Sequence, residues 1–441
     1  MIVHAETLRA RLKPPERLTG NAVALMGNTG LTSLLGVVFW VGATRLYPAD
    51  VLGQDAGLIA GMMLLSSLSE LSLGQGIPRL LPQVLSRRRL AVAAAYAVTA
   101  AVAVLLAAGF ALLAPELSPG FAFLHADHGL QALLVGAVVL WNVFALQDAA
   151  LVAVRKAALV PLENAVFGVL KILLMVMFAQ SRTAHGVLLG WVLAMVIVVP
   201  PVNWFLMTRL LRAPNAVRPT APGALPLEDR RKVGRYLAGD YAASLLGQGC
   251  NMLLPVLVLA TLGQRASAYF YVAFTIAVAV NALAIGLSTS LVVEGAHEER
   301  ELRRLAQRTL HRYATLLLPA MLLAIAAAPF LLQPFGVEYT QRATSLLQLL
   351  LAGCIPQTLV TVYLGMERVR GKAGRILAVQ ALAFASVLTG VGLLMPAHGI
   401  LGVGLAWLAA WALTAFAVLP GLRSAVRSPE TLRRAAQHRQ P

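Results

Sequence analysis

The sequence predicts an all-α polytopic membrane protein, and its composition and its apolar runs both favour this class. Apolar residues make up 59% of the chain and charged residues 12%, against roughly 45–50% and 25% in soluble domains. Runs of mostly apolar residues recur along the chain, and about 20 such residues suffice to cross a bilayer as a helix. A transmembrane barrel would show short segments of alternating polarity instead.

The apolar runs divide the chain into about 12 transmembrane helices. They begin near Asn21, Asp55, Ala91, Leu130, Leu159, His185, Arg235, Ser267, Arg312, Ala343, Arg375 and Gly399, and the last ends near Leu419. Residues 1–20 are polar and basic and lack the apolar centre of a signal peptide, so we expect a cytoplasmic tail there. Cys250 and Cys354 both fall inside spans, and we therefore expect no structural disulfide.

The distribution of positive charge predicts the orientation. With the amino terminus inside, 31 of the 36 Lys and Arg residues fall in the tails and the even-numbered gaps between spans. The exceptions are Arg45, Arg182, Arg265 and Arg342 in odd-numbered gaps, and Lys171 within a span. The positive-inside rule then places both termini in the cytoplasm, with the chain in the cytoplasmic (inner) membrane. The net charge of +17 reports this topology, and it indicates anionic inner-leaflet lipid rather than nucleic acid as a partner.

Short strings that recur in order indicate an internal repeat. Leu52-Gly53-Gln54, Lys156-Ala157 and Ala184-His185-Gly186 match Leu262-Gly263-Gln264, Lys372-Ala373 and Ala397-His398-Gly399. Each half has six spans, an even number, so both halves enter the membrane in the same direction as parallel repeats. The predicted division is a tail at 1–20, a first lobe at 21–212, a cytoplasmic linker at 213–234, a second lobe at 235–421 and a basic tail at 422–441.

No motif in the sequence indicates catalysis, and we expect neither an enzyme nor a cofactor. The string GMERVRGKAG at 365–374 lacks the Ser or Thr that follows Lys in a phosphate-binding loop, and HExxH, GxSxG and CxxC spacings are absent. His125 and His128 could pair around a metal ion, but a solvated external loop is the favoured interpretation. We predict no metal site.

Ionisable residues inside the spans are the candidate functional residues, because charge in a bilayer is costly. They are Glu70, Arg79, Asp148, Glu163, Lys171 and Asp240. Lys171 lies about twelve residues from either end of its span, where its side chain reaches the interface poorly, and we expect it to face a cavity or an acidic partner. Glu70 and Arg79 are nine residues apart, half a turn out of phase with a rise of about 13.5 Å. They cannot pair on one regular helix: either a break at 74–78 redirects one of them, or each has its own role. The Arg79 side chain could also extend to the cytoplasmic interface.

The remaining candidates have structural alternatives. Asp148, Asp240 and Glu163 are candidates for gating or ion coupling, although Asp148 and Asp240 could instead pair with interfacial Arg or Lys. Gln248 and Asn251 are candidates for the substrate cavity, with hydrogen bonding between helices as the alternative. A stripe of small residues, Gly53, Gly57 and Gly61, predicts close helix packing rather than a site.

The stretch TRLYPADVLGQDAGLIAGMMLLSSLSELSLGQGIPRLL resembles the first loop and second helix of the Wzx-type polysaccharide flippases. These belong to the multidrug/oligosaccharidyl-lipid/polysaccharide exporter superfamily. The family often has an acid, then Leu-Gly-Leu-Gly, then Arg nine residues beyond the acid. Glu70, Leu71–Gly74 and Arg79 take these places, with Ser72 at one usual glycine. LLQPFGVEYTQRATSLLQLL and LMPAHGILGVGLAWLAAWAL resemble the family's loop before helix ten and the entry to its last repeat.

The resemblance implies two six-helix lobes around a central cavity that work by alternating access on a polyprenyl-pyrophosphate oligosaccharide. It implies that Arg79 contacts the pyrophosphate, and we add Lys171 from its depth and charge, with Glu70, Gln248 and Asn251 lining the cavity. The resemblance also implies that transport could be coupled to Na⁺ or H⁺ and that the protein could contact glycan-assembly proteins. The alternatives are a cation-coupled small-molecule exporter of the same fold and a membrane enzyme of glycan assembly. The first span, NAVALMGNTGLTSLLGVVFWVGATR, lacks the acid typical of the antiporters, and the short outer loops disfavour the enzyme.

Overall fold

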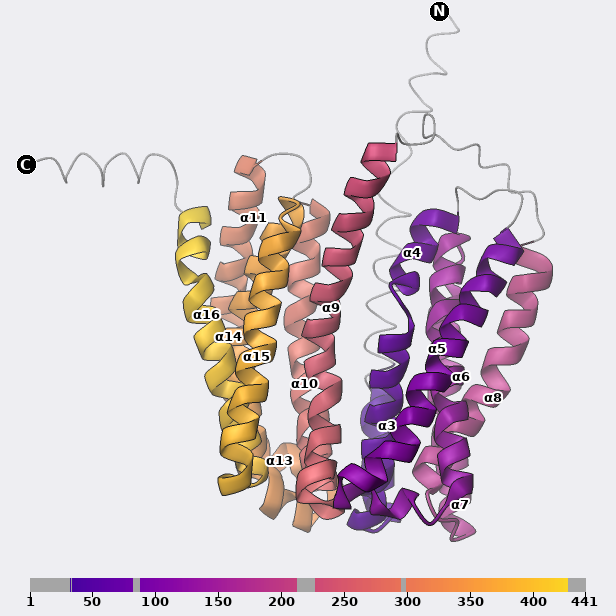
Figure 1. Cartoon of the computed structure of the whole chain (residues 1–441). Coiled ribbons are helices and arrows are strands. Elements are labelled where there is room, and N and C mark those ends of the chain that lie inside the picture. The colour runs from indigo at the N-terminus through magenta and orange to yellow at the C-terminus, as the bar shows by residue number, and fades with distance from the viewer. Residues whose placement is uncertain (1–31, 33, 82–87, 212–226, 295–298, 427–441) are drawn as a thin grey trace, which may run out of the picture.

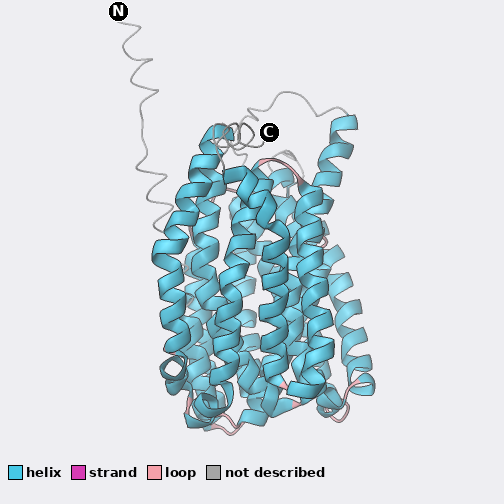
Figure 2. Cartoon of the chain, turned by 90° about the vertical axis from the view of Figure 1, so that its left-hand side faces the viewer, coloured by secondary structure: helices cyan, strands magenta, loops and turns pink. Residues whose placement is uncertain are grey.

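The computed structural model describes residues 32, 34–81, 88–211, 227–294 and 299–426, with the backbone alone at 79–80, 227–238, 240–241, 283–294, 299–303 and 425–426. All regular structure in this part of the chain is helical (Figure 2). The two predicted tails, the start of the first span and the linker up to residue 226 lie largely outside the described residues. A bilayer favours this all-helical structure, because a helix forms all of its backbone hydrogen bonds internally and lipid offers none.

The first half of the chain forms the bundle on the right of Figure 1. Its elements are a helix at Leu34–Leu46, α3 (Ala49–Ser69), α4 (Leu73–Leu80), α5 (Arg88–Leu117), η2 (Pro119–Leu124), α6 (His128–Ala153), α7 (Leu159–Gln180), α8 (Gly186–Phe205) and η3 (Leu206–Leu210). In the following text, "upper end" and "lower end" refer to the bundle as Figure 1 draws it, with α4 at the upper end and α13 at the lower end.

The second half forms the bundle on the left of Figure 1. Its elements are α9 (Leu227–Leu262), α10 (Gln264–Glu294), α11 (Glu299–Arg312), η4 (Tyr313–Leu317), α12 (Leu318–Ala326), α13 (Ala328–Leu332), η5 (Gln333–Phe335), α14 (Val337–Val369), α15 (Ala373–His398) and α16 (Ile400–Val426).

Ten helices in the described part of the chain are long and apolar enough to cross a membrane. The helix at Leu34–Leu46 and α10 occupy the places of the first and eighth predicted spans, so the order of elements follows the expected one. The chain is a multi-pass membrane protein. Two helices extend well beyond their predicted starts: α9 begins at Leu227, and the ninth span begins with the charged helix α11. Hydropathy reports only the part of a helix inside the bilayer, whereas Glu, Arg, Leu and Gln continue a helix readily in water.

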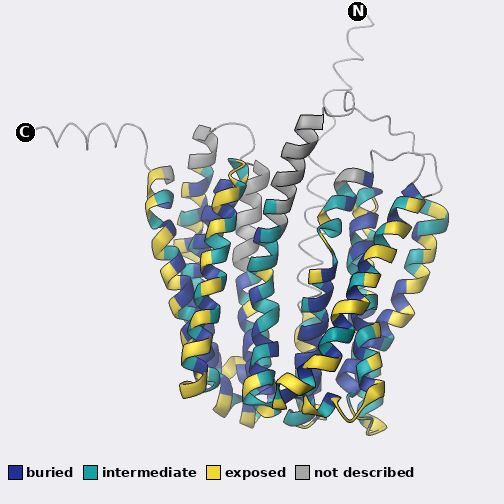
Figure 3. Ribbon diagram, viewed as in Figure 1, coloured by how far each residue is buried: buried dark blue, intermediate teal, exposed yellow. Residues whose placement is uncertain are grey.

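Burial separates the central helices from the peripheral ones (Figure 3). Most of the apolar stretch of α3 and of α14 is buried, whereas most of α5, α7 and α12 is not. The exposed apolar side chains on the peripheral helices, such as Leu105 on α5 and Leu323 on α12, have the chemistry of the surrounding hydrocarbon. The central helices α3 and α14 therefore carry the contacts that decide how the bundle is arranged.

Two turns that match in sequence also match in geometry, which supports the internal repeat. Lys156 N–H donates to Leu151 O at 2.9 Å after Arg155, whose φ is 60°. In the second half, Lys372 N–H donates to Glu367 O at 3.0 Å after Gly371, whose φ is 68°. Both are left-handed helix ends closed by the same hydrogen bond, and they join the fourth and fifth helices of their halves.

The predicted small-residue stripe on α3 is confirmed as a close helix contact, and it lies between the two halves. A Cβ atom at Gly53 would overlap the backbone carbonyl of Gln264, and one at Gly57 would overlap the Leu259 side chain. A Cβ at Gly61 would be 3.9 Å from Val256. The missing side chains let α3 of the first half lie against α9 and α10 of the second.

Hydrogen bonds reinforce this contact at the lower end of the bundle. Ser267 Oγ donates to Gly53 O at 3.1 Å, and Ser118 Oγ donates to Ala260 O at 2.6 Å. Arg45 Nε donates to Pro334 O at 2.8 Å. Each bond joins one half to the other, so the two halves are fastened together at this end.

Methyl groups placed in this contact should destabilise the structure. Gly53→Ala and Gly120→Ala each put a Cβ against a backbone carbonyl of the other half, and overpacking of this kind costs about 1–3 kcal/mol. Thermal unfolding in detergent, followed by tryptophan fluorescence, should show a lower midpoint for both. Gly136→Ala is the control, because a Cβ there meets nothing within 4 Å and alanine favours a helix by about 1 kcal/mol. Equal midpoints for all three variants would contradict the close contact.

Candidate functional site

The helix that carries Glu70 breaks directly after it. Leu71 and Ser72 have φ values of 49° and 68°, in the left-handed region that side chains other than glycine adopt only at a cost. The break at 74–78 that would have let Glu70 pair with Arg79 is not found, since Gly74 and Pro78 lie inside the continuous helix α4. Ser72 stands where the flippase pattern Leu-Gly-Leu-Gly has its first glycine. The positive φ of residue 72 explains a glycine at this position, because glycine adopts that conformation without strain.

A small polar pocket lies at this break, between the two halves. It has a volume of about 60 Å³ and is lined by Ser67, Glu70, Ser72, Gln75, Ser244, Leu245 and Gln248. The first four residues come from α3, α4 and their junction, and the last three come from α9. Two predicted cavity residues, Glu70 and Gln248, are therefore brought together. Among the described lining side chains, Glu70 supplies the one ionisable group.

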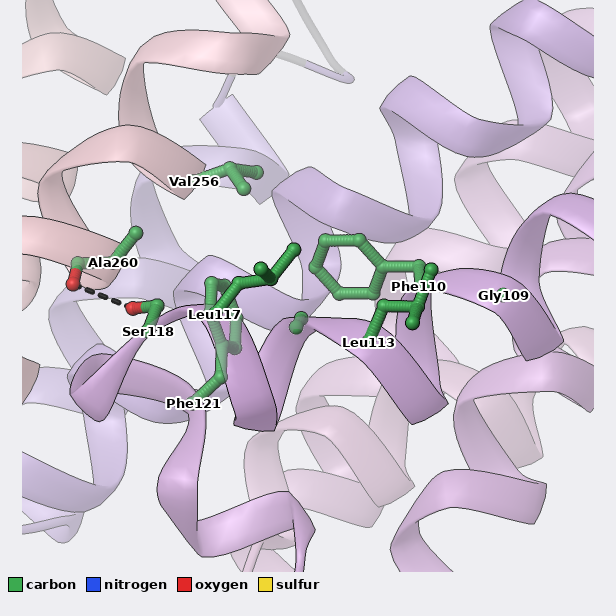
Figure 4. Close-up of a pocket in the computed structure, with 9 residues that line it drawn as sticks. Gly109, Phe110, Leu113, Leu117, Ser118, Phe121, Val256 and Ala260 are labelled. Carbon is green, nitrogen blue, oxygen red and sulfur yellow. Dashed lines mark hydrogen bonds between the residues drawn. The ribbon is translucent and has the colours of Figure 1, made fainter.

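An apolar groove lies further down the same interface (Figure 4). Its volume is about 340 Å³, and it lies between α5, η2 and α9. Phe110, Leu113, Phe121 and Val256 are among its lining residues, and the Ser118–Ala260 hydrogen bond crosses its floor. Val256 is eight residues after Gln248 on α9, a rise of about 12 Å. One helix of the second half thus borders both a polar pocket and an apolar groove.

Lys171 does not line the polar pocket. It is buried inside the first half, with Nζ 3.8 Å from the centre of the Trp191 ring, 4.8 Å from that of Phe39 and 5.1 Å from that of Phe167. No salt bridge to Lys171 occurs among the described residues. The expected acidic partner is replaced by aromatic faces, whose quadrupoles attract a desolvated ammonium by about 2 kcal/mol or more.

Asp55, a residue that the sequence did not single out, is completely buried. Its Oδ1 atom lies 2.7 Å from His185 Nδ1, and its Oδ2 atom accepts hydrogen bonds from the amides of Val187 and Leu188 at 3.1 Å each. The carboxylate therefore caps the N-terminus of α8 and ties it to α3, where the positive end of the helix dipole favours an anion. The predicted second span began at Asp55, so the residue was counted as its boundary. The start of α3 at Ala49 places it inside the helix.

Asp148 and Glu163 lie together near the upper end of the first half. Gln147 Nε2 donates to Glu163 Oε1, and Asn203 Nδ2 donates to Gln147 Oε1. Tyr96 Oη donates to Asn203 Oδ1 at 2.9 Å. The sequence named both acids but not the two amides and the phenol around them, because these come from three helices, α6, α8 and α5, with no shared spacing.

The other predicted site residues are not among the described side chains that line the polar pocket. Asn251 lies on α9, three residues beyond Gln248, and does not line the pocket. Arg79 lies on α4 and Asp240 on α9, but the side chains of both are outside the described part of the structure. His125 and His128 lie at the predicted external loop between η2 and α6, and no metal-binding group of three His, Cys, Asp or Glu occurs in the searched, described residues.

Comparison with known proteins identifies the fold. No protein-family model matches the chain, and no curated protein matches its sequence. An inward-facing multidrug resistance MATE family transporter of the MOP superfamily superposes with a TM-score of 0.64 at 14% identity, over 90% of this chain and 94% of that one. The chain has the fold of the MOP-superfamily transporters. The lipid II flippase MurJ, in an inward closed conformation, gives a TM-score of 0.62 at 12% identity, over 91% of this chain and 87% of that one.

A MOP-superfamily transporter from Pyrococcus furiosus also shares this fold, with a TM-score of 0.58 at 13% identity over 92% of this chain and 95% of that one. Both a drug transporter and a lipid flippase are therefore among the structural neighbours. These likenesses, all at 14% identity or less, show the fold of the chain.

Replacement of the buried lysine should stabilise the protein. Lys171→Met removes a buried ammonium that forms no salt bridge among the described residues, and the desolvation cost of such an unpaired charge exceeds the attraction of about 2 kcal/mol that the three aromatic rings supply. Lys156→Met is the matched control, because Lys156 is exposed, and its midpoint should move by less than about 0.5 kcal/mol. Thermal unfolding in detergent measures both. A lower midpoint for Lys171→Met would mean that the ammonium has a strong partner.

Glycine at the break after Glu70 should also stabilise the protein. Ser72→Gly removes the clash of a Cβ atom in a left-handed conformation, which costs about 1–2 kcal/mol. The control is Ser345→Gly in the interior of α14, where an exposed serine is helical and glycine should cost about 0.5–1 kcal/mol. The two unfolding midpoints should shift in opposite directions. A parallel decrease would contradict the left-handed geometry at residue 72.

Proposed function

We propose that the chain is a flippase that moves a polyprenyl-pyrophosphate oligosaccharide across the cytoplasmic membrane by alternating access, for cell-surface polysaccharide synthesis. The observation that carries this proposal is the polar pocket lined by α3, α4 and α9, which joins the two halves where a transporter of the MOP fold would hold its cargo. The described groups, three serine hydroxyls, two glutamine amides and one carboxyl, are those that hydrogen-bond sugar hydroxyls.

The volume of the pocket indicates how it would be used. A water molecule takes about 30 Å³, so the pocket of about 60 Å³ holds water but not a sugar. The oligosaccharide would enter when α9 moves away from α3 and α4, while the contact at the lower end stays closed. The apolar groove beside α5 offers the isoprenoid chain a surface outside the polar pocket.

The cation for the pyrophosphate would come from Arg79 rather than Lys171. Arg79 lies one turn beyond Gln75 on α4, close to the lining residues of the pocket, whereas the Lys171 ammonium is enclosed by aromatic rings. A guanidinium can bind a phosphate with two parallel hydrogen bonds. We therefore assign the pyrophosphate contact to Arg79 and a structural role to Lys171.

Charge at the two ends of the bundle supports the orientation. Arg45, Arg182, Arg265 and Arg342 lie towards the lower end, whereas the described residues at the upper end include a larger set of positive side chains: Arg88, Arg89, Arg155, Lys156, Arg209, Arg368, Arg370, Lys372 and Arg375. The positive-inside rule makes the upper end cytoplasmic, with both termini in the cytoplasm and anionic lipid around the basic turns. The polar pocket would then receive its substrate from the cytoplasmic side, where glycan-assembly proteins make it.

The experiment is translocation in proteoliposomes that contain a fluorescent polyprenyl-pyrophosphate oligosaccharide, with the label quenched from outside to report the transported fraction. Glu70→Gln and Arg79→Ala should each slow translocation about tenfold, since a hydrogen bond to a charged group is worth about 1.5–3 kcal/mol. The matched control is Arg209→Ala, which removes a guanidinium from η3 away from the pocket and should leave the rate unchanged. A wild-type rate for Arg79→Ala would contradict the assignment of the site.

One observation favours a second candidate, a cation-coupled exporter of small cationic compounds. Glu70 places a carboxyl group in the pocket, and no Lys or Arg is among its described lining residues. A carboxylate suits a cationic drug better than it suits a pyrophosphate. Uptake of a fluorescent cation by the same proteoliposomes separates the two functions: transport of the cation without transport of the glycan would favour the exporter.

A further inference from the structure

Two carboxyl groups near the upper end of the first half occupy a site that the substrate pathway does not use. Asp148 lies on α6 and Glu163 on α7, and neither residue lines the polar pocket or the apolar groove. The two are close enough to act on each other's charge. Charged groups at this depth need a compensating partner, because a bilayer offers them no water.

The hydrogen bonds around Glu163 run in one direction. The Tyr96 hydroxyl donates to Asn203, the Asn203 amide donates to Gln147, and the Gln147 amide donates to Glu163 Oε1. The Asn203 amide also donates to Val199 O at 3.2 Å, and the last acceptor of the chain is the carboxyl group of Glu163.

Two carboxyl oxygens remain without a partner. Glu163 is 5% exposed, and its Oε2 atom is buried and forms no hydrogen bond. The Oδ1 atom of Asp148 is also buried and forms no hydrogen bond. An unpaired buried polar atom costs about 1–3 kcal/mol, and more if it is charged.

No cation in the described part of the structure compensates these oxygens. Neither acid forms a salt bridge there. Lys171 lies eight residues beyond Glu163 on α7, about 12 Å along the axis, with its ammonium among aromatic rings. On α5, Arg89 donates to Met207 O at 2.6 Å, and Arg88 has no salt bridge to either acid. The facing residues on α5 and α8 are Tyr96 and Asn203, and neither carries a positive charge.

The number of free oxygens decides which cation fits. Hard metal ions take six or more oxygen ligands, whereas this site has two free carboxyl oxygens. A proton needs a single oxygen, and it removes one of the two negative charges. We propose that Asp148 and Glu163 form a proton-binding pair, in which the Glu163 carboxylate takes a proton from water at the upper end of the bundle to give the neutral acid. That the bound proton drives transport rests on the proposed flippase function.

The test is infrared titration of the detergent-solubilised full chain, which reports the C=O stretch of a protonated carboxyl group without any substrate. The wild type should show a buried carboxylic-acid band that disappears as the pH rises. Glu163→Gln should lose this band completely, and Asp148→Asn should shift the pH at which it disappears. Glu116→Gln, the same change at an exposed acid, should keep the wild-type titration.

Other outcomes would overturn the proposal. An intact band in Glu163→Gln, or the absence of any buried-acid band in the wild type, would each exclude a proton site at Glu163. Unfolding midpoints of the variants show whether they are folded, and Asp148→Asn tests the pair if Glu163→Gln is not. Translocation under an imposed pH gradient is measured separately: an intact band without glycan transport would refute the flippase function and leave the proton site standing.

Discussion

The close approach of α3 to α9 and α10 is the contact on which the arrangement of the two halves depends. Three glycines at every fourth position make one face of α3 flat, so a helix of the second half can lie against it. The polar pocket lies at the upper edge of this contact, and the apolar groove lies beside it. Both sites therefore owe their position to side chains that are missing. Larger side chains on this face of α3 would push the two halves apart, and neither the polar pocket nor the apolar groove would then form.

The structure compensates buried charge in three different ways. The Asp55 carboxylate is paired with His185 and with two amides at the start of α8, so each of its oxygens has a donor. The Lys171 ammonium is surrounded by aromatic rings, which attract it without a counter-charge. Glu163 has amide support on one oxygen only. The first two arrangements leave no carboxyl oxygen free, whereas the third leaves one carboxyl oxygen of Glu163 available to a proton.

Features that repeat along one helix could be predicted from the sequence, whereas features assembled from several helices could not. The apolar runs predicted the order of the helices, and the spacing of the glycines predicted close packing. Glu70 and Gln248 were both identified as polar residues at depth, and they share a pocket. In contrast, Trp191 and Phe39 lie far from Lys171 in sequence, so no spacing could place their rings around it. The amides near Glu163 come from α6 and α8 for the same reason.

The sequence offered 74–78 as a possible helix break, whereas the chain breaks directly after Glu70. Gly74 and Pro78 are the residues that ordinarily interrupt a helix, yet both lie within α4, and the left-handed turn falls on Leu71 and Ser72. Pro78 cannot donate the helical hydrogen bond to Gly74 O, and α4 ends two residues later, at Leu80. A left-handed leucine and serine carry no signature in sequence, since nearly every residue of these types is found in other conformations.

The hydroxyl groups that join the halves have a consequence for how easily they separate. Ser267 lies in the first turn of α10 and donates to Gly53 O across the interface. A serine in a helix can instead donate to the carbonyl four residues earlier, as Ser69 does to Leu65 and Thr414 to Ala410. For Ser267 that carbonyl belongs to Gly263. When the halves part, the hydroxyl can exchange one acceptor for the other by a rotation about χ1, so the interface can be opened without stranding a donor in lipid.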